Sequence, residues 1–269
     1  MKRWITLGML ALAALLSTGV AQANHSWGSY HWARTSNPFT LQLVDSVANG
    51  WNAHLTTASS DWSVATVLDT RITSGGDDST TRKRCKPVSG KVHVCNAPYG
   101  FNGWLGIAQI WPSGSHITKA VVKNNDSYLD NPGFITPYET AEWRQMVICQ
   151  EVGHALGLDH QDENFDNPNL GTCMDYTSDP STNQHPDAHD YAQLATIYGH
   201  TDSNNTYTQP TKFAAPEASA DHGEQEDLGT PTGKKDGKGR DILFVKDLGA
   251  GQKRFTWVIW ADWSPSNGK

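Results

Sequence analysis

Apolar and polar residues follow two different periods along the chain, and each period predicts a kind of element. Alternation typical of strands covers residues 39–44, 64–72, 91–95, 105–111 and 116–123. Apolar residues at helical spacing cover residues 46–61, 140–158 and 187–198. The polar stretch 74–84 shows neither period and is expected to be a solvated loop. Strands and helices in this mixed order predict an α+β domain.

Two further stretches without a regular period have different meanings. Residues 161–184 are irregular over a length that is unusual for a plain connector, so we expect a functional loop there. Residues 201–240 are rich in small, polar and charged residues, as is typical of a flexible linker. Beyond it, two apolar and aromatic runs flank Gly249-Ala250-Gly251 and predict a β-hairpin. A lone hairpin is marginal in water, so this one is expected to dock on the main domain or to bind a partner.

The N-terminus has the composition of an export signal. Lys2 and Arg3 form a basic start, residues 4–20 are mostly apolar, and Ala21-Gln22-Ala23 supplies the small residues that a signal peptidase reads. The apolar run is short for a membrane anchor, and no later run is long enough to span a bilayer. We therefore expect a signal peptide at 1–23, a main domain at 24–200, a linker at 201–240 and a hairpin at 241–269.

Charge and cysteine content narrow the class of protein. The formal net charge is −7, and it becomes more negative when two cations leave with the signal, which argues against nucleic acid as a partner. The chain has four cysteines, Cys85, Cys95, Cys149 and Cys173. In an exported protein an even number suggests disulfides, and four cysteines can form two disulfides in three possible pairings. The pair Cys85–Cys95 is favoured because it closes a short loop that contains glycine. Zinc binding by cysteines is the alternative, although no Cys-x-x-Cys spacing occurs.

The residues that suggest chemistry lie between positions 150 and 160, which read QEVGHALGLDH. Gln150 and His154 are one helical turn apart and share a face, with Glu151 beside them. Gly157 can adopt a left-handed conformation, end the helix and turn His160 back toward that face. Zinc held by residues 150, 154 and 160 would keep an open position for water, and Glu151 would take the proton of that water as general base.

The pattern Glu151-x-x-His154-x-x-Gly157-x-x-His160 resembles the zinc-binding consensus of the metzincin metalloproteases, and it looks most like matrixin-type members. Downstream, Cys173-Met174-Asp175-Tyr176 resembles the methionine turn that metzincins place beneath the metal. The resemblance implies a metzincin-like catalytic domain with a mixed twisted sheet, an active-site helix, a Met-turn and a C-terminal helix.

The same resemblance implies roles for individual residues. Met174 would be structural, and Tyr176 would help to stabilise the oxyanion. If the turn lies under the helix, Cys149 comes close to Cys173, and the two would form the second disulfide. Matrixins are kept latent by a pro-segment cysteine, and residues 24–64 contain no cysteine that could play that part.

Gln150 departs from the family pattern, which has histidine at this position. An amide oxygen is a weaker zinc ligand than imidazole, so three interpretations stay open. Gln150 Oε1 still ligates zinc, or another histidine replaces it, or the site is metal-poor and the scaffold inactive. The histidines considered as replacements are His93, His116, His185 and His189.

Acidic residues crowd the loop near the motif, namely Asp162, Glu163, Asp166 and Asp175. They predict either a Ca²⁺ site or a solvated acidic loop. Taken together, the sequence predicts a secreted, monomeric zinc metalloendopeptidase that acts on peptide or protein substrates. The alternative is a catalytically impaired scaffold that binds a protein or glycan through the cleft or the tryptophan-rich hairpin.

Overall fold

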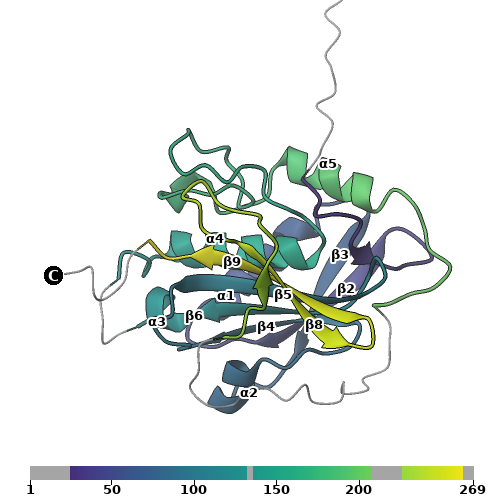
Figure 1. The fold of residues 1–269 in the computed structure, drawn as a ribbon, viewed down its shortest axis with the longest axis horizontal. Coiled ribbons are helices and arrows are strands. Elements are labelled where there is room, and N and C mark those ends of the chain that lie inside the picture. Colours follow the sequence, from purple (N-terminus) through teal and green to yellow (C-terminus); the bar gives the residue numbers. More distant parts are fainter. Residues whose placement is uncertain (1–24, 132–135, 208–225, 263–269) are drawn as a thin grey trace, which may run out of the picture.

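The structure is a computed structural model that describes residues 25–131, 136–207 and 226–262 (Figure 1). The expected signal peptide, residues 1–23, lies outside the described residues. The strands are β1 (His31–Trp32), β2 (Phe39–Ser46), β3 (Leu68–Ser74), β4 (Lys91–Ala97), β5 (Trp104–Ser113), β6 (His116–Asn125), β7 (Thr230–Pro231), β8 (Leu243–Gly249) and β9 (Gln252–Trp260). The helices are α1 (Trp51–Trp62), α2 (Ser79–Arg84), α3 (Asp126–Leu129), α4 (Ala141–Ala155) and α5 (Ala188–Ile197), with a 3₁₀ turn η1 (Pro180–Thr182).

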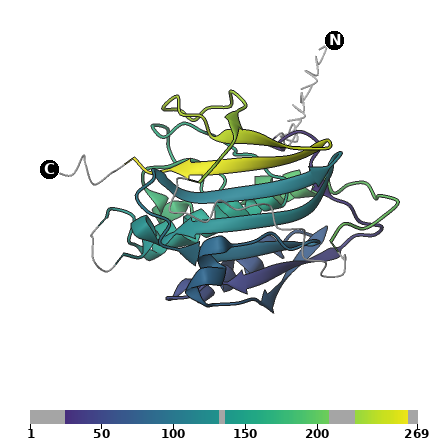
Figure 2. The same ribbon diagram turned by 60° about the horizontal axis from the view of Figure 1, so that its bottom comes forward.

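One twisted mixed sheet contains all the described strands (Figure 2). Its order is β3-β2-β4-β6-β5-β9-β8-β7, and β1 pairs with β6. Strands β3, β2, β4 and β6 are parallel, whereas β5 runs antiparallel to both β6 and β9. Helix α1 supplies the crossover that the parallel pair β2 and β3 requires. The mixed sheet and its helices confirm the predicted α+β class.

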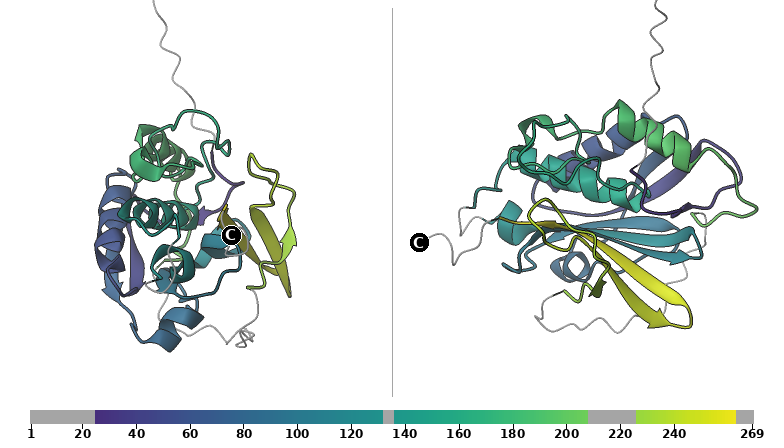
Figure 3. Two further views of the ribbon diagram at one scale, coloured as in Figure 1. Left: turned by 90° about the vertical axis from the view of Figure 1, so that its left-hand side faces the viewer. Right: turned by 45° about the horizontal axis from the view of Figure 1, so that its top comes forward.

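Helices α1, α4 and α5 lie on one side of this sheet (Figure 3). Helix α4 contacts β5 and β6 on the sheet and α1 beside it. Every residue of α4 from 145 to 155 is buried, so this helix belongs to the core rather than to the surface. Its position brings the segment 150–155 directly over the centre of the sheet, next to β5.

Two buried indoles hold α4 in place. Trp62 Nε1 donates a hydrogen bond to the carbonyl of Cys149 at 3.1 Å, and Trp32 Nε1 donates to the carbonyl of Ala155 at 2.9 Å. Both side chains are fully buried, so each contributes apolar contact area and leaves no unpaired indole N–H. The orientation of α4 is therefore fixed near both ends of the segment that carries the motif.

The helix predicted at 140–158 is confirmed as α4, which begins after Thr140. The Thr140 hydroxyl oxygen accepts from the backbone N–H of Trp143 at 3.2 Å and caps the helix. The prediction of a loop over 74–84 was wrong in its second half, where α2 forms with Asp78 as its cap. None of the α2 residues is buried, so the helix has no apolar period that a sequence pattern could reveal.

The C-terminal part of the chain contributes to the same sheet. Strands β8 and β9 pair with each other, and β9 also pairs with β5. Within the range expected as a linker, residues 208–225 lie outside the described part, and residues 226–240 include β7, which pairs with β8. In the described residues, no helix has the length and apolarity needed to cross a membrane.

Candidate functional site

Two histidines meet at the C-terminal end of α4. His154 lies in the last turn of the helix, and Gly157 then reverses the chain with a φ of 100°. A Cβ at Gly157 would lie 2.5 Å from the carbonyl oxygen of Tyr30, so only glycine fits this turn. His160 returns toward the helix, and its Nε2 lies 2.9 Å from Nε2 of His154.

Hydrogen bonds define which ring nitrogen carries the proton. Nδ1 of His154 bonds to the carbonyl of Leu158 at 2.8 Å, and because a carbonyl can only accept, Nδ1 must be the donor. Nδ1 of His160 has no hydrogen-bond partner among the described residues, and the nearest carboxylate oxygens, of Asp159 and Glu163, both lie 3.8 Å away. Nε2 of His154 therefore has its lone pair directed at Nε2 of His160. Burial, followed by the charge of His160, holds the pKa of His154 well below its usual value.

A divalent cation fits between these two nitrogens. Zinc–nitrogen bonds of about 2.0–2.1 Å at a tetrahedral angle separate two nitrogens by roughly 3.3 Å, close to the observed spacing. Neutral imidazoles with a fixed tautomer are the form that ligates metals.

Glu151, three residues before His154 on α4, has a buried carboxylate with no partner of its own. Its side chain is fully buried, and neither oxygen has a hydrogen-bond partner among the described residues. Burial raises the pKa of Glu151 well above its ordinary value. The neighbouring strand approaches closely because Gly106 has no side chain, since a Cβ there would lie 2.8 Å from Oε1 of Glu151. An unpartnered buried carboxylate is costly, which points to a charge or a proton donor that binds there.

Gln150 lies one turn before His154 on α4. Its amide nitrogen donates to the carbonyl of Cys173 at 2.7 Å, which leaves Oε1 as a buried acceptor without a partner among the described residues. The buried polar groups that α4 contributes are thus the amide of Gln150, the carboxylate of Glu151 and the imidazole of His154.

The segment around Met174 packs beneath the helix. A Cβ at Gly153 would lie 2.5 Å from Sδ of Met174 and 2.8 Å from the ring of Trp62, so glycine permits this packing. The structure contains the disulfides Cys149–Cys173 and Cys85–Cys95, which are the two predicted pairs. The first of them joins the helix to the turn.

Strand β9 covers the two histidines. The indole of Trp257 stacks on the ring of His154 with centroids 4.7 Å apart and an angle of 10°, and it meets His160 edge-on at 5.1 Å. The hydroxyl of Tyr176 donates to the carbonyl of Val258 at 3.1 Å, and its ring lies 4.3 Å from that of His160. Burial raises the pKa of Tyr176 well above its usual value, so the hydroxyl stays a donor.

Lys234, in the segment before β8, contacts both the loop after α4 and the indole of Trp257. Lys234 bridges the carboxylates of Asp159 and Glu163, and its ammonium lies 5.4 Å from the ring centroid of Trp257. Burial tends to raise the pKa of Glu163, but the bonds to His160 and Lys234 outweigh it and lower this pKa to about 2. The residues around the histidines are therefore tied to both the loop after α4 and the C-terminal segment.

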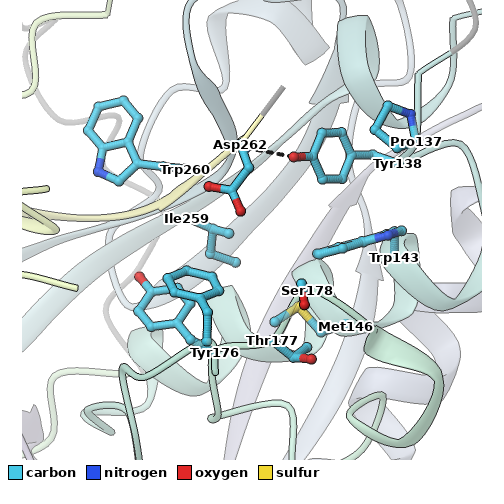
Figure 4. A pocket seen from close by; sticks show the side chains of 11 residues that line it. Pro137, Tyr138, Trp143, Met146, Tyr176, Thr177, Ser178, Ile259, Trp260 and Asp262 are labelled. Carbon is cyan, nitrogen blue, oxygen red and sulfur yellow. Dashed lines mark hydrogen bonds between the residues drawn. The ribbon is translucent and has the colours of Figure 1, made fainter. Parts of the chain in front are cut away.

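A cavity of about 230 Å³ lies beside the covered histidines (Figure 4). Met146 and Trp143 of α4 form one wall, Tyr176 forms another, and Ile259 of β9 points into the space between them. Near its mouth, the hydroxyl of Tyr138 accepts from the backbone N–H of Asp262 at 2.6 Å. The lining is mostly apolar and aromatic, which suits a large apolar side chain.

The histidines considered as replacement ligands have other partners. His93 bonds to Ser46 and to the carbonyl of Lys86 through its two ring nitrogens. The other three also have contacts outside this site, His116 with Asp202, His185 with Asp61, and His189 with the ring of His25.

Amide groups of the acidic loop donate hydrogen bonds to its own carboxylates. Asp162 accepts from the backbone of Asn164 and from Asn167, while Asp175 accepts from Leu170 and Asn183. These bonds occupy one oxygen of Asp175 and both oxygens of Asp162, and they give no support to a Ca²⁺ site.

Sequence reasoning missed Trp257, Val258 and Lys234 as neighbours of the site. All three are far from the motif in sequence: the pairing of β9 with β5 brings Trp257 and Val258 there, and the ion pairs with Asp159 and Glu163 hold Lys234. The alternation of β9 signals a strand but contains no information about its partner.

No protein-family model matches this chain, and no curated protein sequence matches it. Two solved structures are similar. One is high choriolytic enzyme 1, a hatching-enzyme zinc protease from Oryzias latipes (medaka fish), with a TM-score of 0.35 and 13% identity over 66% of this chain and 98% of that one. The other is myroilysin, with a TM-score of 0.31 and 10% identity over 68% of this chain and 97% of that one. The functional assignment therefore rests on the residues of the site.

Proposed function

We propose that this chain is an exported, monomeric zinc-dependent metalloendopeptidase. The observation that carries the proposal is the pair of Nε2 atoms of His154 and His160, which face each other at 2.9 Å, with the proton of His154 held on Nδ1 by the carbonyl of Leu158. The expected signal at 1–23 and the two disulfides support an oxidising compartment outside the cytoplasm.

His154 and His160 would hold the metal, and Oε1 of Gln150 is proposed as the third ligand because it is buried and unpartnered. Zinc bound there would supply Lewis acidity and lower the pKa of a coordinated water. Glu151 would act as the general base that takes a proton from water and delivers it to the leaving amine. Its high pKa in the absence of a cation has the cause expected for such a group, namely burial.

Tyr176 is proposed to polarise the carbonyl that is attacked. Its hydroxyl already donates to a peptide carbonyl, that of Val258, at 3.1 Å. The same donor would strengthen its bond as the carbonyl oxygen gains negative charge. Met174 supports the histidines from below, where Gly153 allows it to approach.

The test compares Glu151→Gln with the native chain. Cleavage of casein or of a fluorogenic peptide library should be sensitive to a chelator, restored by Zn²⁺, and reduced by about 10²–10⁴-fold in Glu151→Gln, with zinc content unchanged. The matched control is Glu142→Gln, at an exposed position in the first turn of the same helix. Equal activity in Glu151→Gln and Glu142→Gln would contradict the proposal.

The covered site favours a second candidate, an inactive scaffold that binds a protein or glycan. Trp257 occupies the space over His154, and Gln150 replaces a stronger ligand. The scaffold function predicts no hydrolysis by the native chain even when its zinc content is complete. Binding of a protein or glycan probe that persists in Glu151→Gln and after zinc removal would then identify this second function.

A further inference from the structure

Three histidines and one aspartate from three separate segments meet on the far side of β1 from the site described above. His31 belongs to β1, and His116 is the first residue of β6. The two are register partners, so their rings lie side by side with centroids 4.9 Å apart. His200 and Asp202 follow the end of α5 and complete the cluster.

The polar atoms of this cluster have the spacing of metal ligands. Nε2 of His31 lies 3.2 Å from Nε2 of His200 and 3.4 Å from Oδ1 of Asp202. Nε2 of His116 lies 3.2 Å from the same oxygen, and that of His200 lies 3.7 Å from it. Ligands bound tetrahedrally at about 2.0–2.1 Å are roughly 3.3 Å apart, which matches these distances.

The surrounding bonds orient the ligand atoms toward one another. Nδ1 of His31 donates to the carbonyl of Ser29 at 2.7 Å, which leaves Nε2 as the ring nitrogen that faces His200 and Asp202. Arg34 occupies the other carboxylate oxygen, Oδ2 of Asp202, through its guanidinium at 2.8 Å and its backbone N–H at 3.1 Å. Oδ1 of Asp202 is thus the carboxylate oxygen that faces the imidazoles, and it lies 3.4 Å from Nε2 of His31.

We propose that His31, His200 and Asp202 bind one Zn²⁺ ion as a structural site, with His116 beside them at Oδ1 of Asp202. Imidazole nitrogens and a carboxylate oxygen are a donor set that zinc prefers to calcium or magnesium. The side chains of His116 and His200 are 30% and 52% exposed, which gives the ion a route in. The site joins the N-terminal segment, the sheet and the chain after α5.

The test measures zinc retained through gel filtration by protein prepared without a histidine tag and incubated with ZnCl₂. The double variant His154→Ala/His160→Ala removes the first site and should still retain one zinc per chain. Adding His116→Ala and His200→Ala should abolish this zinc and the rise in thermal midpoint that it produces. Adding His185→Ala, an exposed histidine paired with Asp61, should change neither. Circular dichroism checks that each variant folds.

A double variant His154→Ala/His160→Ala that is folded and retains no zinc would overturn the proposal. So would zinc that persists after both His116 and His200 are replaced. Because the first site is absent in all of these variants, either result is independent of whether the chain is a peptidase.

A different observation supports a second inference, which rests on the proposed peptidase function. Strand β5 lies next to Glu151 through Gly106, and its outer edge is paired with β9. The partners are Gly106↔Ile259, Ile107↔Val258 and Ala108↔Trp257. An extended peptide that adds to this edge, as in other cases of strand addition, would take the place of these three β9 residues.

The side chains of β9 fill the positions that such a peptide needs. Trp257 covers His154, the carbonyl of Val258 accepts from Tyr176, and Ile259 points into the cavity. Trp257 is only 1% exposed, so the histidines are closed to a substrate while β9 is paired. We infer that β9 is a built-in competitor, and that the substrates are extended peptides with a large apolar side chain for the cavity.

The test weakens the contact between β9 and the site, and it replaces none of the proposed zinc ligands. Trp257→Ala should raise kcat/KM for an apolar fluorogenic peptide at least about 10-fold, since the lost indole contact is worth more than 1.4 kcal/mol. Phe255→Ala on the same strand, which packs on Trp27 and Tyr30, is the control and should have a smaller effect. A synthetic peptide of residues 252–262 should inhibit the Trp257→Ala variant competitively.

A second readout does not depend on catalysis. In the Glu151→Gln background, Trp257→Ala should bind the same labelled peptide more tightly by fluorescence anisotropy. Unchanged peptide binding on replacing Trp257 would overturn the inference about β9. Tighter binding with no hydrolysis by any Glu151-containing variant would instead contradict the peptidase function.

Discussion

The side-chain amide of Gln150 donates a 2.7 Å hydrogen bond to the backbone carbonyl of Cys173, and this bond joins the motif helix to the turn that carries Met174. The bond fixes the amide so that Oε1 is left buried without a partner. Gln150, which stands where the family pattern has a ligand histidine, therefore also makes a structural hydrogen bond. A histidine at position 150 could donate the same bond to Cys173 through its Nδ1.

Gln150→His is expected to tighten zinc binding by about 10–100-fold, because imidazole is a stronger ligand than an amide oxygen. Competition with a fluorescent chelator gives the Kd. Gln145→His, at a buried position of the same helix that contacts His54, serves as the control and should leave the Kd unchanged. A Kd that does not differ between Gln150→His and the native chain would show that position 150 is not a ligand.

The two disulfides are expected to contribute differently to the site. Replacing Cys149 and Cys173 by alanine should lower the free energy of unfolding by about 3–4 kcal/mol, as expected for a loop of this length, and should also reduce zinc content. Replacing Cys85 and Cys95 should cost slightly less, because that loop is shorter, and should leave zinc content unchanged. Urea unfolding and metal analysis measure both effects, and equal zinc loss in the two variants would refute this distinction.

The packing of Gly153 against Met174 predicts a coupling between these residues. Gly153→Ala should destabilise the protein by about 1–3 kcal/mol, because the added methyl would lie 2.5 Å from Sδ. In the double variant with Met174→Ala, part of that cost should disappear. A double-mutant cycle from urea unfolding gives the interaction energy, and simple additivity would argue against the contact.

Asp126 predicts a pH dependence of stability away from the site. Burial raises its pKa from 3.8 to about 6, although Asn96 and Trp51 donate hydrogen bonds to it. The folded state therefore holds this proton more tightly than the unfolded state. The contribution to stability is greatest below pH 4 and is lost as the pH rises toward 6, to a limit of about 3 kcal/mol.

Asp126→Asn should remove this part of the pH dependence. Urea unfolding of both proteins at several pH values between 4 and 7 gives the difference directly. A parallel pH profile for the native chain and the variant would show that Asp126 does not titrate in this range.

Local patterns in the sequence were enough to predict α4 and the turn at Gly157. These features depend on spacing within a few residues, and so does the grouping of Gln150, Glu151 and His154 on one helix. The pairing of β9 with β5 could not be predicted, because alternation defines a strand but not its neighbour. The cluster around Asp202 was missed for a related reason, since its members are far apart in sequence and none of them forms a motif.

The same limit explains α2, whose stability comes from the Asp78 cap rather than from an apolar face. It also explains why Trp257 was expected only to pack in a hairpin or bind a partner. Tertiary contacts place it over His154, and no local signal marks that role.

The most direct test of the central claim is a crystal structure of the Glu151→Gln variant grown with excess Zn²⁺, with diffraction data collected on both sides of the zinc absorption edge. The anomalous difference map locates zinc without any assumption about activity. We expect a peak within bonding distance of Nε2 of both His154 and His160, with Oε1 of Gln150 as a further ligand. A map with no peak between these two nitrogens would contradict the account, even if zinc appears elsewhere in the molecule.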